Sequence, residues 1–110
     1  MKKIVYIAHP ISGNVQENLT DLFRIISIIN KEKEYKSVVA TAPYVADVFS
    51  LNDTIKEERA KGINNNIAQI SRGNFDEIWL TGNKLSSGME QESLLFLSLG
   101  KQVRNFINKF

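Results

Sequence analysis

The feature that most constrains the fold is a short, uninterrupted apolar run near the start of the chain, Ile4 to Ala8. Its residues favour β-strands, and the absence of apolar–polar alternation predicts a strand that is buried on both faces. Such a strand needs helices above and below it, which is the arrangement found in parallel α/β sheets. The run therefore predicts a parallel sheet that is sandwiched between helices.

The rest of the chain supplies the alternation of strands and helices that this sheet requires. Three further strands are predicted over residues 37–42, 75–81 and 102–107. Helical patterns separate them over residues 15–34, from 52 or 53 to about 71, and from 87 onwards, with an ambiguous, short helical stretch at 44–51. Because each connection contains a helix, we expect one domain over residues 1–110 with a four-stranded parallel sheet in the order 2-1-3-4.

Capping signals and apolar spacing indicate where these helices begin and which faces they bury. Asn14 with Glu17, and Ser87 with Glu90, have the spacing of a capping box at a helix N-terminus. Gly73 is the expected C-terminal stop of the central helix. The buried positions predicted for the first helix are Leu19, Leu22, Phe23, Ile26 and Ile29. Those predicted for the central helix are Ile55, Ile63, Ile67 and Ile70.

Composition excludes several classes of protein. A formal net charge of +2 is too small to indicate a polymeric nucleic acid as partner. The lack of cysteine excludes a disulfide scaffold and cysteine-ligated metals, and a single histidine argues against a histidine-rich metal site. We therefore expect no metal and no cofactor. No apolar run is long enough for a signal peptide or a membrane span, so we expect a cytoplasmic protein with no membrane partner.

Three loops are expected to meet where a parallel sheet binds ligands, beyond the carboxyl ends of its strands. They cover residues 9–14, 43–47 and 82–88. Two of them lead into helix N-termini and carry small polar residues, an arrangement that can hold phosphate or hydroxyl groups through backbone N–H groups. An ordinary strand-to-helix turn explains the same residues. His9 and Asp47 are expected at the same edge. His9 could act in acid–base chemistry or simply pack in its loop, and Asp47 could bind a hydroxyl group or simply cap a helix.

Glu92 is the most unusual acidic residue in the chain. At helical spacing it shares a stripe with Met89, Phe96 and Leu99, and a carboxylate there must be paired, reach water or serve chemistry. With no cysteine and no histidine cluster, a nucleophile or base has to come from Glu90, Glu92 or Asp47. Carboxylate nucleophiles are typical of reactions at an anomeric carbon. The alternative is an acid that merely favours the first turns of a helix.

Three segments of the chain resemble the nucleoside 2-deoxyribosyltransferase-like superfamily, and most closely its small phage and prophage-type members. They are YIAHPISGN at 6–14, FDEIWLTGN at 75–83 and SSGMEQESLLFLSLGK at 86–101. The resemblance implies a small Rossmann-like (flavodoxin-like) three-layer α/β sandwich. It also implies cleavage of an N-glycosidic bond by a glutamate nucleophile.

Carried over by position, the resemblance assigns a role to individual residues. Glu92 matches the nucleophile, because it lies nine residues before Lys101. At position 66, where transferases carry an acid, this chain has Asn66. The residues that would hold phosphate or hydroxyl groups are Ser12, Gly13, Ser86, Ser87 and Gly88, with Asp47 near the same edge. Those that would line the base pocket are Tyr6 and His9.

The function expected from these observations is N-glycoside hydrolysis or (deoxy)ribosyl transfer on a small nucleoside or nucleoside 5′-monophosphate. The alternative is a non-catalytic module that binds or sequesters a nucleotide, and a scaffold that leaves the pocket unused is a third possibility. Trp79 and the run Leu94–Leu97 offer more apolar surface than one thin sheet needs. We therefore expect a homodimer.

Overall fold

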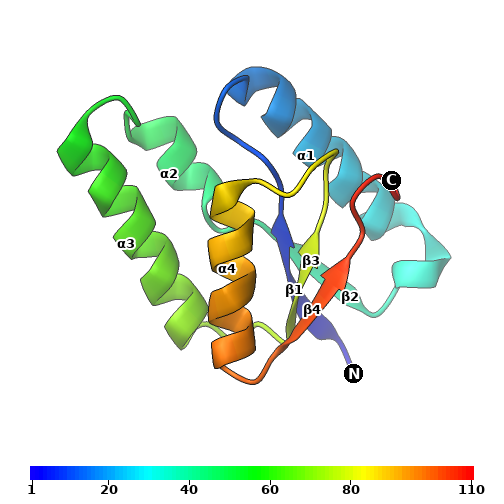
Figure 1. Ribbon diagram of the computed structural model, residues 1–110. Helices are drawn as coiled ribbons and strands as arrows, with labels where there is room; N and C mark the ends of the chain where they lie inside the picture. Colours follow the sequence, from blue (N-terminus) through cyan, green and yellow to red (C-terminus); the bar gives the residue numbers. More distant parts are fainter.

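A four-stranded parallel sheet forms the centre of the computed structural model, which describes residues 1–110 (Figure 1). Its strands are β1 (Lys3–Ala8), β2 (Val38–Thr41), β3 (Glu77–Leu80) and β4 (Gln102–Asn105). They lie in the order β2-β1-β3-β4, and all three pairings are parallel. The predicted α/β class, the parallel sheet and the strand order are confirmed.

Helices cover both faces of the sheet and make it the middle of three layers (Figure 1). They are α1 (Val15–Lys31), α2 (Val45–Ser50), α3 (Lys56–Arg72) and α4 (Ser87–Ser98), with a short 3-10 helix at Lys33–Tyr35. Helix α1 packs on one face, and α3 and α4 pack on the other. This arrangement is a small Rossmann-like fold. No helix combines the length and the apolar character that crossing a membrane requires.

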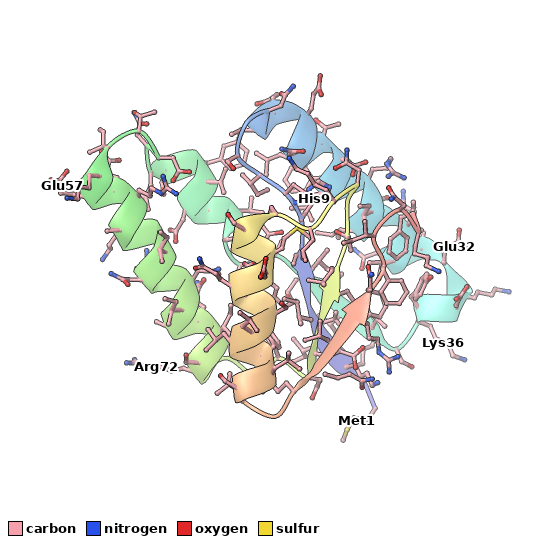
Figure 2. All side chains as sticks on the ribbon, viewed as in Figure 1. Met1, His9, Glu32, Lys36, Glu57 and Arg72 are labelled. Atoms are coloured by element: carbon pink, nitrogen blue, oxygen red, sulfur yellow. The ribbon has the colours of Figure 1, made fainter.

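Two apolar cores lie on opposite sides of the sheet, and side chains fill the space between the layers (Figure 2). Strand β1 is buried on both faces, as its apolar run predicts, with alternate residues entering each core. The core under α1 contains Val5, Ile7, Leu19, Leu22, Ile25, Ile29 and Trp79. The core under α3 and α4 contains Tyr6, Ala8, Ile70, Ile78, Leu80, Met89 and Phe96.

Trp79 lies inside the first core, so the prediction that it offers surface to a partner is wrong. Its exposed fraction is only 4%. Its ring stacks on Phe106 with the centroids 4.3 Å apart. Strand β3 lies between two other strands and is buried on both faces, which leaves the indole no route to the surface. Of the apolar run in α4, Leu94 and Leu97 are exposed and Phe96 is fully buried.

The helices bury fewer residues than their apolar spacing predicts. In α1, Phe23 is half-exposed and Ile25 is buried in its place. In α3 only Ile70 is buried, while Ile63 and Ile67 are 49% and 47% exposed. Figure 1 shows the first half of α3 beside α2 and away from the strands. Apolar side chains in that half therefore meet no sheet, whatever their spacing.

Both predicted capping boxes are wrong. The N-cap of α4 is Ser86, whose Oγ accepts a hydrogen bond from the Met89 backbone N–H at 3.2 Å. Ser87 is already the first helical residue, so Glu90 lies one position too late to complete a box. Asn14 stands at the N-cap of α1, but its side chain makes no capping hydrogen bond.

The ends of α3 also differ from the prediction. Asn52 Oδ1 accepts from the backbone N–H of Thr54 at 3.0 Å, which forms an Asx turn and keeps the helix from beginning before Lys56. At the other end, Gly73 has an extended backbone conformation with φ of −73° rather than a left-handed one. It is therefore not the left-handed C′ glycine that was predicted.

A buried carboxylate ties three strands together at the amino end of the sheet. Glu77 is 3% exposed, and its Oε1 accepts from Trp79 Nε1 at 2.6 Å and from Arg104 Nε at 2.9 Å. Its Oε2 accepts from Lys3 Nζ at 3.2 Å. Burial raises the pKa of Glu77, but the hydrogen bonds from Trp79, Lys3 and Arg104 outweigh that effect and lower it overall. Both carboxylate oxygens of Glu77 therefore accept hydrogen bonds from the protein, so this group is structural.

Candidate functional site

The carboxyl ends of three strands are joined by direct contact between loops. Gly82, which follows β3, has φ of +87°, and a Cβ at this position would lie 2.7 Å from Pro10 Cδ. Only glycine fits both the left-handed conformation and this close approach. The Gly82 carbonyl also accepts from the backbone N–H of Asn108 at 2.8 Å. The loops after β1 and β3 and the segment after β4 therefore form one rim.

A three-membered hydrogen-bonded cluster lies on the α3–α4 side of the sheet. It consists of Tyr6 from β1, Asn66 from α3 and Glu92 from α4. The Tyr6 hydroxyl donates to Glu92 Oε2, and Asn66 Nδ2 donates to the same oxygen at 2.9 Å. The Tyr6 oxygen lies 2.9 Å from Asn66 Oδ1. The three side chains thus close a triangle around one carboxylate oxygen.

The other oxygen of Glu92 is free. Glu92 Oε1 accepts no hydrogen bond from the protein, since both bonds to this carboxylate end on Oε2. The molecule has no buried side-chain nitrogen or oxygen without a partner. Because Glu92 is half-buried as a residue and no fully buried polar atom lacks a partner, the unpartnered Oε1 keeps some contact with solvent. The carboxylate is therefore anchored on one side and open on the other.

The protonation of the cluster follows from its burial. Burial raises the pKa of Glu92 above its usual value, and the hydrogen bonds from Tyr6 and Asn66 oppose that rise without cancelling it. Burial, and then the negative charge of Glu92, raises the pKa of Tyr6 well above its usual value. Tyr6 consequently keeps its proton and acts as a donor.

Aromatic rings surround the hydroxyl that holds Glu92. The Tyr6 ring lies 5.6 Å from the Tyr44 ring, 5.4 Å from Phe75 in a T-shaped arrangement and 5.5 Å from Phe96. The Tyr44 hydroxyl donates to the Ile7 carbonyl at 2.6 Å, which fixes that ring in place. Tyr44 is half-buried, so part of it remains on the surface. The carboxylate therefore stands beside a rigid, mainly apolar wall.

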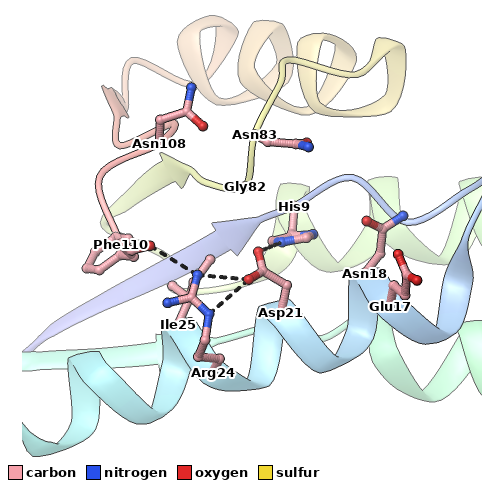
Figure 3. A pocket seen from close by; sticks show the side chains of 10 residues that line it. All are labelled: His9, Glu17, Asn18, Asp21, Arg24, Ile25, Gly82, Asn83, Asn108 and Phe110. Atoms are coloured by element: carbon pink, nitrogen blue, oxygen red, sulfur yellow. Dashed lines mark hydrogen bonds and ion pairs between the residues drawn. The ribbon is translucent and has the colours of Figure 1, made fainter.

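A second polar cluster occupies the opposite face, along α1 (Figure 3). It lines a cavity of about 300 Å³ between α1, the loop after β3 and the end of the chain. His9 Nε2 bonds to Asp21 Oδ2 at 2.8 Å, and His9 Nδ1 lies 2.6 Å from the Pro10 carbonyl oxygen. Asp21 Oδ1 accepts two bonds from Arg24, which also donates to the Phe110 carbonyl at 3.0 Å.

The groups of this α1-side cluster are largely satisfied by one another. Both ring nitrogens of His9 have a protein partner within hydrogen-bond distance, Asp21 Oδ2 and the Pro10 carbonyl oxygen. Burial raises the pKa of Asp21, but the hydrogen bonds from His9 and Arg24 outweigh it and lower that pKa overall. Neither this cavity nor a neighbouring one along α1 is lined by Glu92. The Glu92 cluster is nevertheless the better candidate, because two donors from different elements hold one oxygen of its carboxylate and the other oxygen has no partner in the protein.

The predicted base-pocket pair is not brought together. Tyr6 enters the core under α3 and α4, whereas His9 bonds to Asp21 of α1 on the other side of the sheet. Successive strand residues point to opposite faces, and these two residues are separated by an odd number of positions. The two side chains therefore lie on opposite sides of the sheet.

The other predicted residues make no hydrogen bond to Glu92. Ser12 and Gly13 are exposed in the loop before α1, where Gly13 has φ of +96°. Ser87 and Gly88 are exposed in the first turn of α4, while the Ser86 hydroxyl is occupied as the N-cap. These serines and glycines remain free to meet a ligand, except for the capping hydroxyl.

Asp47 is bonded to Asn65 of α3, a residue that the sequence analysis does not single out. Asp47 Oδ2 accepts from Asn65 Nδ2 at 3.2 Å. The sequence analysis assigns no functional role to Tyr44, and it mentions Asn66 only as an amide at a position where transferases carry an acidic residue. One available signal is the triplet Asn64-Asn65-Asn66, since three amides in succession are unfavourable inside a helix unless they are bonded. No group of three or more histidine, aspartate or glutamate side chains is placed to hold a metal ion.

One known family matches almost the whole chain. The chain belongs to a family described as a domain of unknown function (DUF7768), whose sequence profile matches residues 3–106. A comparison with curated proteins gives no match.

Proposed function

We propose that this protein cleaves the N-glycosidic bond of a small nucleoside or nucleoside 5′-monophosphate, with Glu92 as the nucleophile. The observation that carries the proposal is the divided environment of the Glu92 carboxylate. Its Oε2 is held by Tyr6 and Asn66, and its Oε1 is open to solvent. A carboxylate fixed by one oxygen and free at the other suits attack on an anomeric carbon.

The chemistry proceeds in two steps. In the first, Oε1 forms a bond to C1′ while the bond from C1′ to the base nitrogen breaks, and its electron pair leaves with the base. In the second, water attacks C1′ and restores the carboxylate, releasing a proton to solvent. If a second base takes the place of water, the outcome is transfer rather than hydrolysis. Positive charge that develops at C1′ is stabilised by the carboxylate in both steps.

Tyr6 and Asn66 are positioning residues in this scheme. They contact Glu92 rather than the reacting carbon, and together they fix the direction in which Oε1 points. Their donated hydrogen bonds also favour the ionised carboxylate, which is the form that attacks. The aromatic rings around Tyr6 keep its hydroxyl in place without competing for its proton.

One observation favours the alternative, a module that binds a nucleotide without turnover. A protonated Glu92 would donate to Tyr6, Tyr6 would donate to Asn66 Oδ1, and Asn66 would donate back to Glu92. This ring of hydrogen bonds leaves no member unpaired, and a protonated carboxyl is not a nucleophile. The two functions differ in whether the free base is ever released.

The test is a base-release assay on the Glu92→Gln and Glu90→Gln variants. Glu90 makes no side-chain hydrogen bond and is exposed two residues away, so the second variant is a matched control. Each protein is incubated with a panel of nucleosides and their 5′-monophosphates, and free base is measured by chromatography. We expect Glu92→Gln to lose roughly 10³-fold or more in rate, as for other lost nucleophiles, and Glu90→Gln to keep parental turnover.

Two results would contradict the proposal. One is parental turnover in Glu92→Gln, which would remove Glu92 from the reaction. The other is nucleotide binding by the parent protein, measured by calorimetry, without any release of base from the whole panel. That result would establish the binding module instead.

A further inference from the structure

Cleavage of an N-glycoside leaves an electron pair on the departing base. A neutral base departs as an anion and needs a proton from a general acid, a contribution of roughly 10²- to 10⁴-fold in rate. A base that already carries a positive charge on its glycosidic ring system departs as a neutral molecule. It needs no proton. The acids that surround the nucleophile therefore determine which kind of base the site can release.

No group near Glu92 is placed to supply a proton. The Tyr6 hydroxyl is committed to Glu92, and its pKa is raised well above the usual value, mainly by burial. The Tyr44 hydroxyl donates to the Ile7 carbonyl, and burial together with the charge of Glu92 raises its pKa well above the usual value. Asn66 is an amide, which has no acidic proton to give.

The remaining acid–base residues at this edge of the sheet are engaged elsewhere. Asp47 accepts a hydrogen bond from Asn65 on α3. His9 lies on the α1 side of the sheet, and both its ring nitrogens are bonded, to Pro10 and Asp21. Glu92 itself has to be ionised to attack C1′. The cluster thus holds a nucleophile with no proton donor beside it.

The same surroundings attract a cation. The open Oε1 of Glu92 presents negative charge in a half-buried setting, where electrostatic attraction exceeds that in bulk water. The Tyr44 ring lies 5.6 Å from the ring of Tyr6, which holds Glu92; Tyr44 is half-buried as a residue, and aromatic faces attract organic cations. Lysine and arginine side chains make no contact with this carboxylate.

We propose that the substrate of the Glu92 site is an N-glycoside with a positively charged base, of the pyridinium or N-alkylated purine class. This inference rests on the proposed function. Glu92 Oε1 forms the bond to C1′, the C1′–N bond breaks, and its electron pair neutralises the ring nitrogen. The neutral base then leaves without proton transfer, and water completes hydrolysis as described above.

Matched pairs of substrates test the inference. One pair is 7-methylguanosine and guanosine, which differ by a methyl group and the positive charge it confers. The other is nicotinamide riboside and its uncharged 1,4-dihydro form. Each compound is supplied as the nucleoside and as the 5′-monophosphate, and the methylguanosine pair also as the 2′-deoxy compounds. Free base is measured by chromatography, with Glu92→Gln as the background for spontaneous cleavage.

We expect kcat/KM for the charged member of a pair to exceed that of the neutral member by at least ~100-fold, the usual lower limit of what a general acid contributes. Cleavage of guanosine within tenfold of 7-methylguanosine would overturn the inference and leave the proposed function standing. Release of no base from any charged or neutral compound would overturn both. Equal release by the parent and Glu92→Gln would overturn the proposed function itself.

Discussion

Removing the Tyr6 hydroxyl tests the mechanism at its most constrained contact. Tyr6→Phe keeps the ring among Tyr44, Phe75 and Phe96, so the packing of the core is preserved. It deletes the donor to Glu92 Oε2 and leaves Asn66 as the sole hydrogen-bond partner of that carboxylate. The perturbation therefore acts on the orientation and ionisation of Glu92 and on little else.

The expected magnitude follows from the lost hydrogen bond. A hydrogen bond to a charged group is worth about 1.5–3 kcal/mol, which corresponds to a roughly 10- to 150-fold loss in the rate of base release. The Tyr6 hydrogen bond lowers the pKa of Glu92, so its removal raises that pKa further. The ionised nucleophile then forms at higher pH, and the rising limb of the pH–rate profile moves upwards.

The assay is base release over a range of pH, with thermal unfolding measured alongside. Tyr35→Phe is the matched control, because Tyr35 packs on Trp79 and Phe110 on the other side of the sheet. We expect that control to keep the parental rate and pH profile. A Tyr6→Phe protein that loses rate with an unmoved pH profile would show that Tyr6 merely supports the fold. Unchanged rate would refute the reasoning altogether.

Three further predictions concern stability and assembly. Glu77→Ala should cost about 1–3 kcal/mol of stability, because it leaves the buried Trp79 N–H without an acceptor. The pKa of Glu77 is lowered in the folded state, so the stabilisation that its carboxylate provides is present above the ordinary pKa of 4.5 and is lost as the pH falls through the folded-state pKa. Denaturant titrations of the parent and of Glu77→Gln should therefore converge in acid. Ser86→Ala should cost about 1 kcal/mol as a lost N-cap, whereas Ser87→Ala should be nearly neutral, and equal costs in thermal unfolding would contradict the cap assignment. We propose a homodimer through the exposed Leu94 and Leu97 of α4. Light scattering should show a dimer for the parent and for a Phe23→Glu control, and a monomer for the double variant Leu94→Glu/Leu97→Glu. A parent protein that is monomeric at high micromolar concentration would contradict the proposal.

The architecture could be predicted because its determinants are local. The apolar run of β1 and the helices between strands favour a parallel sheet with a helix in each crossover, and few other topologies remain. The positions of the helix caps are harder to predict from the sequence. Ser86 and Ser87 are adjacent and chemically identical, so only the backbone decides which of them begins α4.

The candidate site could be predicted only in part. Glu92 stands out in the sequence because an acid on an apolar stripe needs an explanation. Its partner Asn66 is 26 positions away, and their contact depends on how α3 packs against α4, which no local pattern encodes. The separation of Tyr6 from His9 could be predicted, since the alternation of β1, continued one residue past its end at Ala8, directs them to opposite sides of the sheet.

The sparse burial of α3 has a consequence for motion. A helix of 17 residues that buries only Ile70, near its end, is held by little apolar contact over its first turns. Segments of this kind open locally at a small fraction of the free energy of global unfolding. We expect the amide hydrogens of residues 60–66 to exchange with solvent far sooner than those of β1 and β3. Each such opening would withdraw Asn66 from Glu92 and widen the approach to Oε1, so that a ligand could enter while the sheet stays intact.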